Sequence, residues 1–440
     1  MALRVLVVIA LTLALLGGGE TLATDASVSF TRDIAPVLIE RCVRCHGDEA
    51  AKGDYRLDTF SHLNRPGDSG RVPISTLDPA KSPFLVLLTT DDPDDRMPQK
   101  GEPLDSSTVD RIRKWIEQGA DFDGPDPEKP LAEFAFEPFA QAPAHYAYPV
   151  PVAAVVGIGK GSIAAGGFRE ITVWNAEGVL EKRIGGVPER ILGLVRGPEE
   201  GTLLFAGGSP GRSGAAGMVD VRGDSGPRVF LRGSDTLLAL AVTRDGSRIA
   251  VGGTERGIVV LDGGTFDRLR TLTSHSDWVL DLAFSSDGRY LATASRDRTA
   301  RIFQVTDGTL VSVFRDHKEA VTAVAFVEGS SRVVSAGKDG RLRIWNPETG
   351  KDTKASEAIG AEVTRLVVDG NRIVSAWTDG RVREYQGDNL KRIRELGASG
   401  EGVLGLAVEG DTIVATHHGG TVRVWDSKTS GITREFPARP

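Results

Sequence analysis

The segment HKEAVTAVAFVEGSSRVVSAGKDGRLRIWN, residues 317–346, contains three short stretches with the composition of β-strands. VTAVAF is almost entirely apolar, RVVSAG follows it after a polar break, and RLRIW alternates between polar and apolar residues up to a tryptophan. Alternation with a period of two is typical of a strand with one buried face. The GKDG sequence before RLRIW marks a tight turn. The segment therefore predicts three consecutive strands.

The last of these strands recurs along the second part of the chain, and each clear copy ends in an aromatic ring. The other copies are EITVW (170–174), TARIF (299–303), RVREY (381–385) and TVRVW (421–425). Two degenerate copies, which end near Arg222 and Leu261, fill the interval after the first copy, so equivalent positions are 39 to 48 residues apart. A period of about 40 residues with three or four strands predicts an all-β, seven-bladed β-propeller over residues 148–440. Eight blades are the alternative, if the aromatic residues just before this region form a divergent blade.

The quoted segment resembles a repeat of the WD-repeat family, and the resemblance extends over roughly residues 148–436. His317, Ser335, Asp339 and Trp345 match the hydrogen-bonded tetrad of that family. The resemblance implies that the aspartate holds the histidine, while the histidine and the serine hold the indole N–H. A buried polar chain would then be fully paired.

Two other repeats carry incomplete tetrads. His275, Thr293 and Asp297 repeat the pattern in the preceding blade, but Phe303 stands in the tryptophan position, so the last hydrogen bond is expected to be missing there. The final blade keeps its Trp-Asp pair at 425–426 and has glycine in place of the turn aspartate, at position 419.

A second informative stretch is ERCVRCHG (40–47), which contains the only two cysteines of the 440-residue chain. A thioredoxin-type redox pair would need a βαβ framework, and the surrounding sequence has none. A zinc site would need four ligands, whereas this part of the chain adds only His46 and His62 to the cysteines. Covalent attachment of a c-type haem needs just this set: the thiols of Cys42 and Cys45 for the two vinyl groups, and the adjacent histidine for the iron. A disulfide remains the other alternative.

A six-coordinate haem iron needs a further axial ligand, and Met97 is the only methionine in this part of the chain once an N-terminal segment is removed. It lies in DDRMPQKGEPL, a loop punctuated by proline and glycine that is suited to holding a thioether against a flat ring. His62 is the alternative ligand, and an open coordination position is a third possibility. A thioether ligand would raise the reduction potential relative to two histidines.

Helices are predicted on both sides of these residues. TRDIAPVLIERC (31–42) reads as a short helix with Asp33 as its cap, and SSTVDRIRKWIEQGA (106–120) reads as a helix with a capping-box-like start at Ser107. In the second helix, valine and isoleucine recur along one face, and Gly119 marks the end. Two such helices would cover one small core.

Together these stretches resemble the class I monohaem cytochromes c and, more closely, the cytochrome c domain of planctomycete and related bacterial secreted proteins. The motifs that carry the resemblance are F-x-x-x-I-x-P-V-L, C-x-x-C-H-G, R-M-P and W-I-x-x-G-A, within about residues 29–122. The resemblance implies a small all-α domain in which Cys42 and Cys45 bind one haem covalently. It also implies that His46 and Met97 are the axial ligands of the haem iron.

The N-terminus MALRVLVVIALTLALLGGGETLATDA (1–26) has one arginine and an apolar run that is too short to span a bilayer. This layout predicts a secretory signal, cleaved after Ala23 or Ala26, with no membrane span afterwards; an uncleaved anchor is the alternative. A periplasmic or secreted location fits c-type haem attachment, which is made outside the cytoplasm. The expected domains are the haem domain (27–122), a Pro/Ala-rich linker (123–147) and the propeller (148–440).

Charge is distributed unevenly, with a balance of −8 over residues 24–128 and +1 over residues 129–440. Two parts with different electrostatics suggest different partners. The acidic run before Met97 is either a docking surface for a basic redox partner or a solvated loop; it comprises Asp91, Asp92, Asp94 and Asp95. The sequence has no basic patch of the kind that would predict nucleic-acid binding. No nucleophile elbow, phosphate loop or carboxylate pair predicts a hydrolase or a transferase.

The favoured function is an exported electron carrier with one covalent haem, in which the propeller is a docking or sensing platform for proteins, including a redox partner. One alternative is an oxidoreductase with a second cofactor in the propeller. For that cofactor the candidate ligands are His417 and His418, predicted to lie in a turn of the last blade. The other alternative is a pure interaction scaffold. The sequence favours a carrier over an enzyme.

Overall fold

The structure is a computed structural model that describes residues 28–48, 50–99, 102–124, 126–131, 139–223, 225–328, 331–397 and 400–438. The expected signal segment lies outside these residues, as does part of the expected linker. The chain divides into two compact units between residues 136 and 137, and each unit is described by itself. Among the helices within the described ranges, none is both long and apolar enough to cross a membrane.

The first unit is built from short helices around one apolar core. Its helical segments are η1 (Phe30–Ile34), α1 (Ala35–Arg41), η2 (Lys52–Asp54), α2 (Phe60–Leu63), η3 (Pro79–Lys81), α3 (Pro83–Thr89) and α4 (Ser106–Glu117). Phe30, Ile34 and Leu38 extend from the first two segments into the core, where they meet Ile112 and Trp115 of α4. The apolar spacing of the two predicted helices thus joins them to the same core.

Both predicted helices are present, but their caps differ from the prediction. Ser29 caps the first segment with its hydroxyl, and the carboxylate of Asp33 accepts a hydrogen bond from the Ser29 N–H at 2.9 Å. Asp105, rather than Ser107, caps α4, because its carboxylate accepts the N–H three residues further on at 2.9 Å. Both caps lie earlier in the sequence than the predicted ones, and the backbone at each is extended, as is usual for a cap residue.

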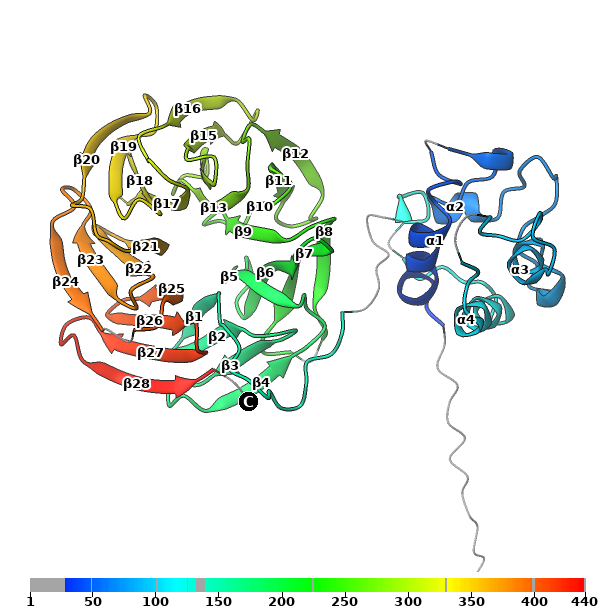
Figure 1. Cartoon of the computed structure of the whole chain (residues 1–440), viewed down its shortest axis with the longest axis horizontal. Helices are drawn as coiled ribbons and strands as arrows, with labels where there is room; N and C mark the ends of the chain where they lie inside the picture. Colours follow the sequence, from blue (N-terminus) through cyan, green and yellow to red (C-terminus); the bar gives the residue numbers. More distant parts are fainter. Residues whose placement is uncertain are drawn as a thin grey trace, which may run out of the picture. The chain divides into compact units, whose positions relative to one another are not determined.

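The second unit is a ring of seven four-stranded antiparallel sheets within the described residues (Figure 1). The predicted count of seven blades is confirmed. Blades 1 to 7 take four consecutive strands each: β1 (Val155–Gly159), β2 (Ser162–Gly166), β3 (Ile171–Trp174), β4 (Leu180–Ile184); β5 (Arg190–Arg196), β6 (Thr202–Ser209), β7 (Ser213–Asp220), β8 (Arg228–Gly233); β9 (Leu237–Val242), β10 (Arg248–Gly253), β11 (Gly257–Asp262), β12 (Arg268–Thr273); β13 (Val279–Phe284), β14 (Tyr290–Ser295), β15 (Ala300–Gln304), β16 (Leu310–Phe314); β17 (Val321–Val327), β18 (Arg332–Gly337), β19 (Leu342–Asn346), β20 (Lys351–Ala355); β21 (Val363–Asp369), β22 (Arg372–Trp377), β23 (Val382–Gln386), β24 (Arg392–Leu396); β25 (Val403–Glu409), β26 (Thr412–His417), β27 (Thr421–Asp426), β28 (Ile432–Pro437).

Every predicted aromatic-ended strand is the third strand of its blade, and the two degenerate copies form β7 and β11. The second blade departs from the prediction in one position. In blade 1 the register pairs Trp174 with Ile163, and the equivalent pair in blade 2 is Val219 with Leu203. Val219 therefore takes the aromatic position that was predicted for Arg222. The eight-residue strands β6 and β7 shift the spacing in this blade.

The ring closes where blade 1 packs against blade 7, and no strand is exchanged between the two sheets. Val155 and Val424 belong to one buried cluster that spans both blades. The ring of Trp174 lies 5.1 Å from that of Phe436, between centroids. Side-chain packing between two complete sheets therefore closes the propeller.

Two charged side chains, Arg365 and Asp281, make contacts between inner parts of the ring. Arg365 on β21 donates to the carbonyls of Ala153 and Leu192, each at 3.3 Å. Asp281 on β13 accepts the N–H of Val324 on β17 at 2.9 Å. Burial raises the pKa of Asp281 to about 6, against the opposing effects of this hydrogen bond and of the Arg365 charge. These contacts thus join strands of different blades.

Candidate cofactor site

The end of α1 places both cysteines and the histidine on one tight turn. The N–H groups of Cys45 and His46 both donate to the carbonyl of Cys42, each at 3.0 Å. Both thiols are free and half-buried. Two sulfurs one turn apart, followed at once by an imidazole, is the spacing that the sequence predicted for this site.

Gly47 allows the chain to fold back immediately after the histidine. A Cβ at this position would lie 2.7 Å from the carbonyl oxygen of Val43, which is too close for any other residue without a shift of the backbone. The N–H of Gly47 donates to the carbonyl of Ala50 at 3.0 Å. The His46 carbonyl then accepts the N–H of Leu57 at 2.6 Å, so the turn is anchored on both sides.

One ring nitrogen of His46 is held by the protein. Its Nδ1 lies 3.1 Å from the backbone carbonyl of Tyr55, and the two rings meet edge to face with centroids 5.7 Å apart. A carbonyl oxygen can only accept, so Nδ1 is the donor in this contact, and the neutral ring carries its lone pair on Nε2. Metal-bound histidines typically make such a contact through the ring nitrogen that does not bind the metal. This contact leaves Nε2 as the ring nitrogen that could bind a metal.

Met97 lies in a loop attached to α3 and packs on the same core as the cysteine turn. Its N–H donates to the carbonyl of Leu87 at 2.8 Å. Its side chain is half-buried and packs against the core cluster that Cys42 also contacts. The guanidinium of Arg41, at the end of α1, donates to the carbonyl of Glu102 beyond the methionine. These contacts join the cysteine turn and the methionine segment to one small core.

Comparisons with known proteins agree with both parts of the chain. Residues 42–101 match the family described as Planctomycete cytochrome C, and residues 266–304 and 308–346 match the WD domain, G-beta repeat. The chain thus combines a segment that matches the planctomycete cytochrome C family with a seven-bladed propeller, two repeats of which match the WD domain. The cytochrome match implies haem c as cofactor.

No curated protein matches the chain. Among solved structures, the crystal structure of the computationally designed Ika8 protein is similar, with 22% identity and a TM-score of 0.53. The match covers 67% of this chain and 88% of that chain. At this identity the likeness concerns the fold alone.

The residues of the cytochrome segment fit the implied group better than they fit the alternatives. In the described residues, no group of three or more His, Cys, Asp or Glu side chains is placed to hold a metal ion. Burial raises the pKa of the Cys42 thiol to about 11, so this sulfur is a neutral thiol at neutral pH. Free thiols beside an oriented imidazole are the donor set that covalent haem needs.

The alternative ligand and the acidic run have local partners of their own. His62 lies in α2, and its Nδ1 is 3.3 Å from a carboxylate oxygen of Asp58. In the acidic run, Asp92 accepts the N–H of Asp94 at 3.0 Å and its carbonyl accepts the N–H of Arg96 at 2.9 Å. All four aspartates of the run are exposed, so the loop before Met97 presents negative charge to solvent.

In the WD-repeat propeller, the predicted tetrad of blade 5 is formed. The Trp345 indole donates to the Ser335 hydroxyl at 3.1 Å, and that hydroxyl lies 2.9 Å from Nε2 of His317. Nδ1 of His317 lies 3.1 Å from a carboxylate oxygen of Asp339. Burial opposes ionisation, but the hydrogen bond and charge of His317 hold the pKa of Asp339 below its usual range.

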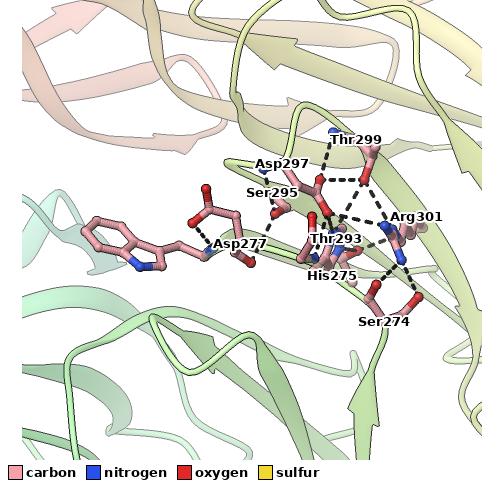
Figure 2. A network of polar contacts seen from close by, with 10 residues as sticks. Ser274, His275, Asp277, Thr293, Ser295, Asp297, Thr299 and Arg301 are labelled. Carbon is pink, nitrogen blue, oxygen red and sulfur yellow. Dashed lines mark hydrogen bonds and ion pairs between the residues drawn. The ribbon is translucent and has the colours of Figure 1, made fainter.

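Figure 2 shows the related polar network of blade 4. In this blade Phe303 stands at the position that Trp345 has in blade 5. His275 lies 2.8 Å from Asp297 through Nδ1 and 2.7 Å from the Thr293 hydroxyl through Nε2. The Thr293 hydroxyl reaches the carbonyl of Arg301 at 3.4 Å instead of accepting from an indole. The predicted loss of the last hydrogen bond is confirmed, and both histidines serve the fold.

The last blade corrects the sequence interpretation of its two histidines. His417 is the final residue of β26 and is fully buried, with Nδ1 3.2 Å from the carbonyl of Glu401. His418 is the exposed residue of the pair and begins the turn. The two do not share a turn, because the strand alternation continues one residue further than predicted.

Sequence reasoning missed the contacts that orient the site. The partner of His46 is a backbone carbonyl at position 55, and any residue type supplies one. The contact between Arg41 and the Glu102 carbonyl also cannot be predicted from residue types, because the acceptor is a backbone group. Gly47 did carry a signal, since it completes the C-x-x-C-H-G motif, and the structure gives its physical reason.

Proposed function

We propose that the protein is an exported c-type cytochrome that carries one electron at a time through a single covalent haem. The observation that carries this proposal is the Cys42–His46 turn, in which two free thiols stand beside an imidazole whose Nδ1 is fixed by the Tyr55 carbonyl. Cys42 and Cys45 would hold the porphyrin by adding their S–H groups across its two vinyl groups. This addition needs no oxidant and has no leaving group. When bound, the haem supplies the one-electron Fe(III)/Fe(II) couple.

The residues of the chain bind and orient in this proposal rather than make or break substrate bonds. His46 offers Nε2 to the iron, and its contact with the Tyr55 carbonyl keeps the ring from rotating. Met97 offers a thioether from a loop that is anchored to α3 through the Leu87 carbonyl. Because the protein already holds both residues, they would need little rearrangement when the oxidation state of a bound haem changes. Electron transfer therefore fits this segment better than catalysis on a substrate.

The propeller serves as the docking platform in the same proposal. The seven four-stranded sheets form the fold by themselves. The turns that connect their strands can therefore vary in sequence and contact other proteins. Export follows the predicted N-terminal signal and suits haem attachment, because that step takes place outside the cytoplasm. The predicted location is therefore the periplasm or the exterior.

Attachment is tested by producing the full chain in a bacterium that carries a c-type maturation system. Intact mass spectrometry should show the polypeptide plus one haem, iron analysis should give one iron per chain, and the reduced protein should show c-type absorption bands. The Cys42→Ser, Cys45→Ser double variant should lack the added mass. Arg44→Ser, an exposed residue of the same turn, is the matched control and should keep the haem. Thiols that remain free or joined in the wild-type protein would refute the proposal.

The assignment of Met97 is tested separately by Met97→Leu, with Met218→Leu in the propeller as the matched control. Loss of the thioether should lower the reduction potential and abolish the near-infrared band of sulfur-ligated ferric haem, while the haem remains attached. The Met218 variant should keep both signatures. A wild-type protein without this band, whose potential Met97→Leu leaves unchanged, would transfer the role to another group, and His62→Ala would then be the next variant.

A further inference from the structure

Tyr55 supplies the backbone carbonyl that holds His46, and its side chain reaches the same histidine. The planes of the two rings meet at 63°, so the imidazole has a packed aromatic neighbour as well as a hydrogen-bond acceptor. Edge-to-face pairs are favoured by the charge distribution of aromatic rings. The carbonyl at this position could come from any residue type, but the ring contact depends on an aromatic side chain.

The hydroxyl of Tyr55 is fixed at the other end of the ring. It donates to the backbone carbonyl of Leu63, at the end of α2, at 2.7 Å. Leu63 is fully buried and belongs to the core of the helical unit. Burial raises the pKa of the Tyr55 hydroxyl above its usual range, so the hydroxyl keeps its proton and remains a donor near neutral pH. The tyrosine side chain thus joins His46 to the core.

The loop that carries Tyr55 is bonded to the cofactor turn on both sides of the tyrosine. Before it, the N–H of Lys52 donates to the carbonyl of Cys45 at 3.1 Å. After it, the N–H of Leu57 donates to the carbonyl of His46. Backbone hydrogen bonds therefore hold the two ends of the loop, and the tyrosine side chain holds the part between them.

The hydrogen bond at Nδ1 affects how strongly the opposite ring nitrogen binds a metal. An imidazole that donates from Nδ1 to a fixed acceptor is a stronger electron donor through Nε2. A hydrogen bond weakens steeply as its angle departs from linear, so rotation of the imidazole would reduce this effect. A stronger axial donor stabilises ferric over ferrous iron. Contacts that fix the imidazole therefore lower the reduction potential of a haem that it binds.

We propose that Tyr55 is a positioning residue, whose side chain keeps His46 in hydrogen-bonding contact with the Tyr55 carbonyl and so lowers the reduction potential of the bound haem. This inference rests on the proposed function, and it adds a residue outside the C-x-x-C-H-G motif. Tyr55 acts through His46 and contributes no ligand of its own. The bond to Leu63 and the ring contact are separate parts of this role, because different substitutions remove them.

The test compares Tyr55→Phe and Tyr55→Leu with the wild-type protein, each as the matured full chain. Tyr55→Phe loses only the bond to Leu63, whereas Tyr55→Leu also loses the ring contact. At the midpoint potential of the wild-type protein, the ratio of ferrous to ferric haem should rise about two- to fivefold in Tyr55→Leu, with a smaller rise in Tyr55→Phe. Proton NMR of the ferric haem methyl groups should show a changed spread of shifts in Tyr55→Leu, because this spread reports the orientation of the axial imidazole.

Phe122→Leu is the matched control for lost core packing. It removes a ring of the same unit that packs on Phe30 and Phe60, and it should leave the ratio and the methyl shifts unchanged. An equal change in this control would assign the effect to general packing and overturn the proposal. So would an unchanged or lower potential in Tyr55→Leu with the haem attached. If Tyr55→Leu fails to fold, Tyr55→Phe carries the test, since it keeps the ring.

A second measurement does not need the haem. In the haem-free full chain at pH 8, long-range proton–nitrogen NMR should show His46 with its proton on Nδ1, and Tyr55→Leu should show a mixture of both tautomers. A mixture already present in the wild-type chain would overturn the proposal. A wild-type protein that never acquires haem would refute the electron-transfer proposal while this tautomer difference persisted. Attached haem with a potential insensitive to Tyr55 would refute only the present inference.

Discussion

The two units use their polar side chains in opposite ways. In blade 5, the aspartate, histidine, serine and tryptophan of the tetrad bond one another, and each has a protein partner. In the helical unit, the protein holds His46 through Nδ1 and leaves two thiols free on the same turn. The propeller is thus complete as a fold, whereas the helical unit contains a donor set that a ligand would complete.

This difference indicates that the two units are stabilised in different ways. The propeller repeats one sheet seven times and buries a contiguous set of aliphatic and aromatic side chains between neighbouring blades. The helical unit has one small core, and its longest helix, α4, spans 12 residues. Small domains with few buried residues commonly depend on a covalent or metal-bound group. The following predictions test this contrast and then sharpen it within the propeller.

The largest expected effect is the loss of stability in the helical unit when the proposed haem is not attached. In the Cys42→Ser, Cys45→Ser variant, the melting temperature of this unit should fall by about 8–16 °C if about 2 kcal/mol is lost. The propeller transition should not move, because it contains no residue of the site. Differential scanning calorimetry of the matured full chain measures both transitions. Equal shifts in both, or in neither, would contradict the contrast.

The next effect concerns the core of the propeller. Trp345 is fully buried, and its ring stacks on that of Phe314 with centroids 4.9 Å apart. Trp345→Ala should therefore lower the free energy of unfolding of the propeller by about 3–5 kcal/mol. Trp278→Ala removes an exposed tryptophan of the same unit and should cost about 0.5 kcal/mol or less. Urea unfolding of the two variants provides the comparison, and similar losses would argue against a core role for Trp345.

A smaller effect separates the complete tetrad from the incomplete one. Ser335→Ala leaves the Trp345 indole and the His317 ring without their shared partner, so it should cost about 1–3 kcal/mol. Thr293→Val removes only the contact to His275 and a longer bond to a carbonyl, and it should cost less. Equal losses in urea unfolding would show that the indole bond adds nothing to blade 5.

Much of the propeller could be predicted from sequence because its signals repeat. The third strand of each blade alternates in steps of two and ends at one fixed place, so seven copies support one another. The prediction was wrong where the repeat is degenerate: Val219, not Arg222, takes the aromatic position, since longer strands in blade 2 shift the spacing. It was also wrong for His417, because a buried histidine at a strand end has the same sequence signature as a turn residue.

For the helical unit, the residue types carried the prediction and the contacts did not. The spacing of Cys42, Cys45 and His46 follows from the chemistry of one cofactor, so a single motif indicates the site. The contacts that orient this site come from backbone groups, such as the Tyr55 carbonyl. Every residue has such groups, so the sequence does not show which one is used. Helix starts were misjudged by a few residues, because Ser29 and Asp105 compete with nearby residues that cap equally well.

The smallest expected effect is a pH dependence with opposite signs at two carboxylates of the propeller. The pKa of Asp339 lies below its usual range in the folded state, so its contribution to stability is complete above about pH 4 and is lost as the pH falls further. The pKa of Asp281 is raised to about 6, so the folded state loses stability as the pH rises from about 4 to about 6. The melting temperature of the propeller should therefore differ less between pH 5 and pH 3 in Asp339→Asn than in the wild-type protein.

Asp281→Asn should act in the other window and flatten the decline between about pH 4 and pH 6. The helical transition should keep its own pH dependence in both variants, because neither carboxylate belongs to that unit. Calorimetry at each pH resolves the two transitions in one scan. If Asp281→Asn altered the dependence below pH 4 instead, the Arg365 charge would outweigh burial at this site. The pKa of Asp281 would then lie below its usual range, as that of Asp339 does.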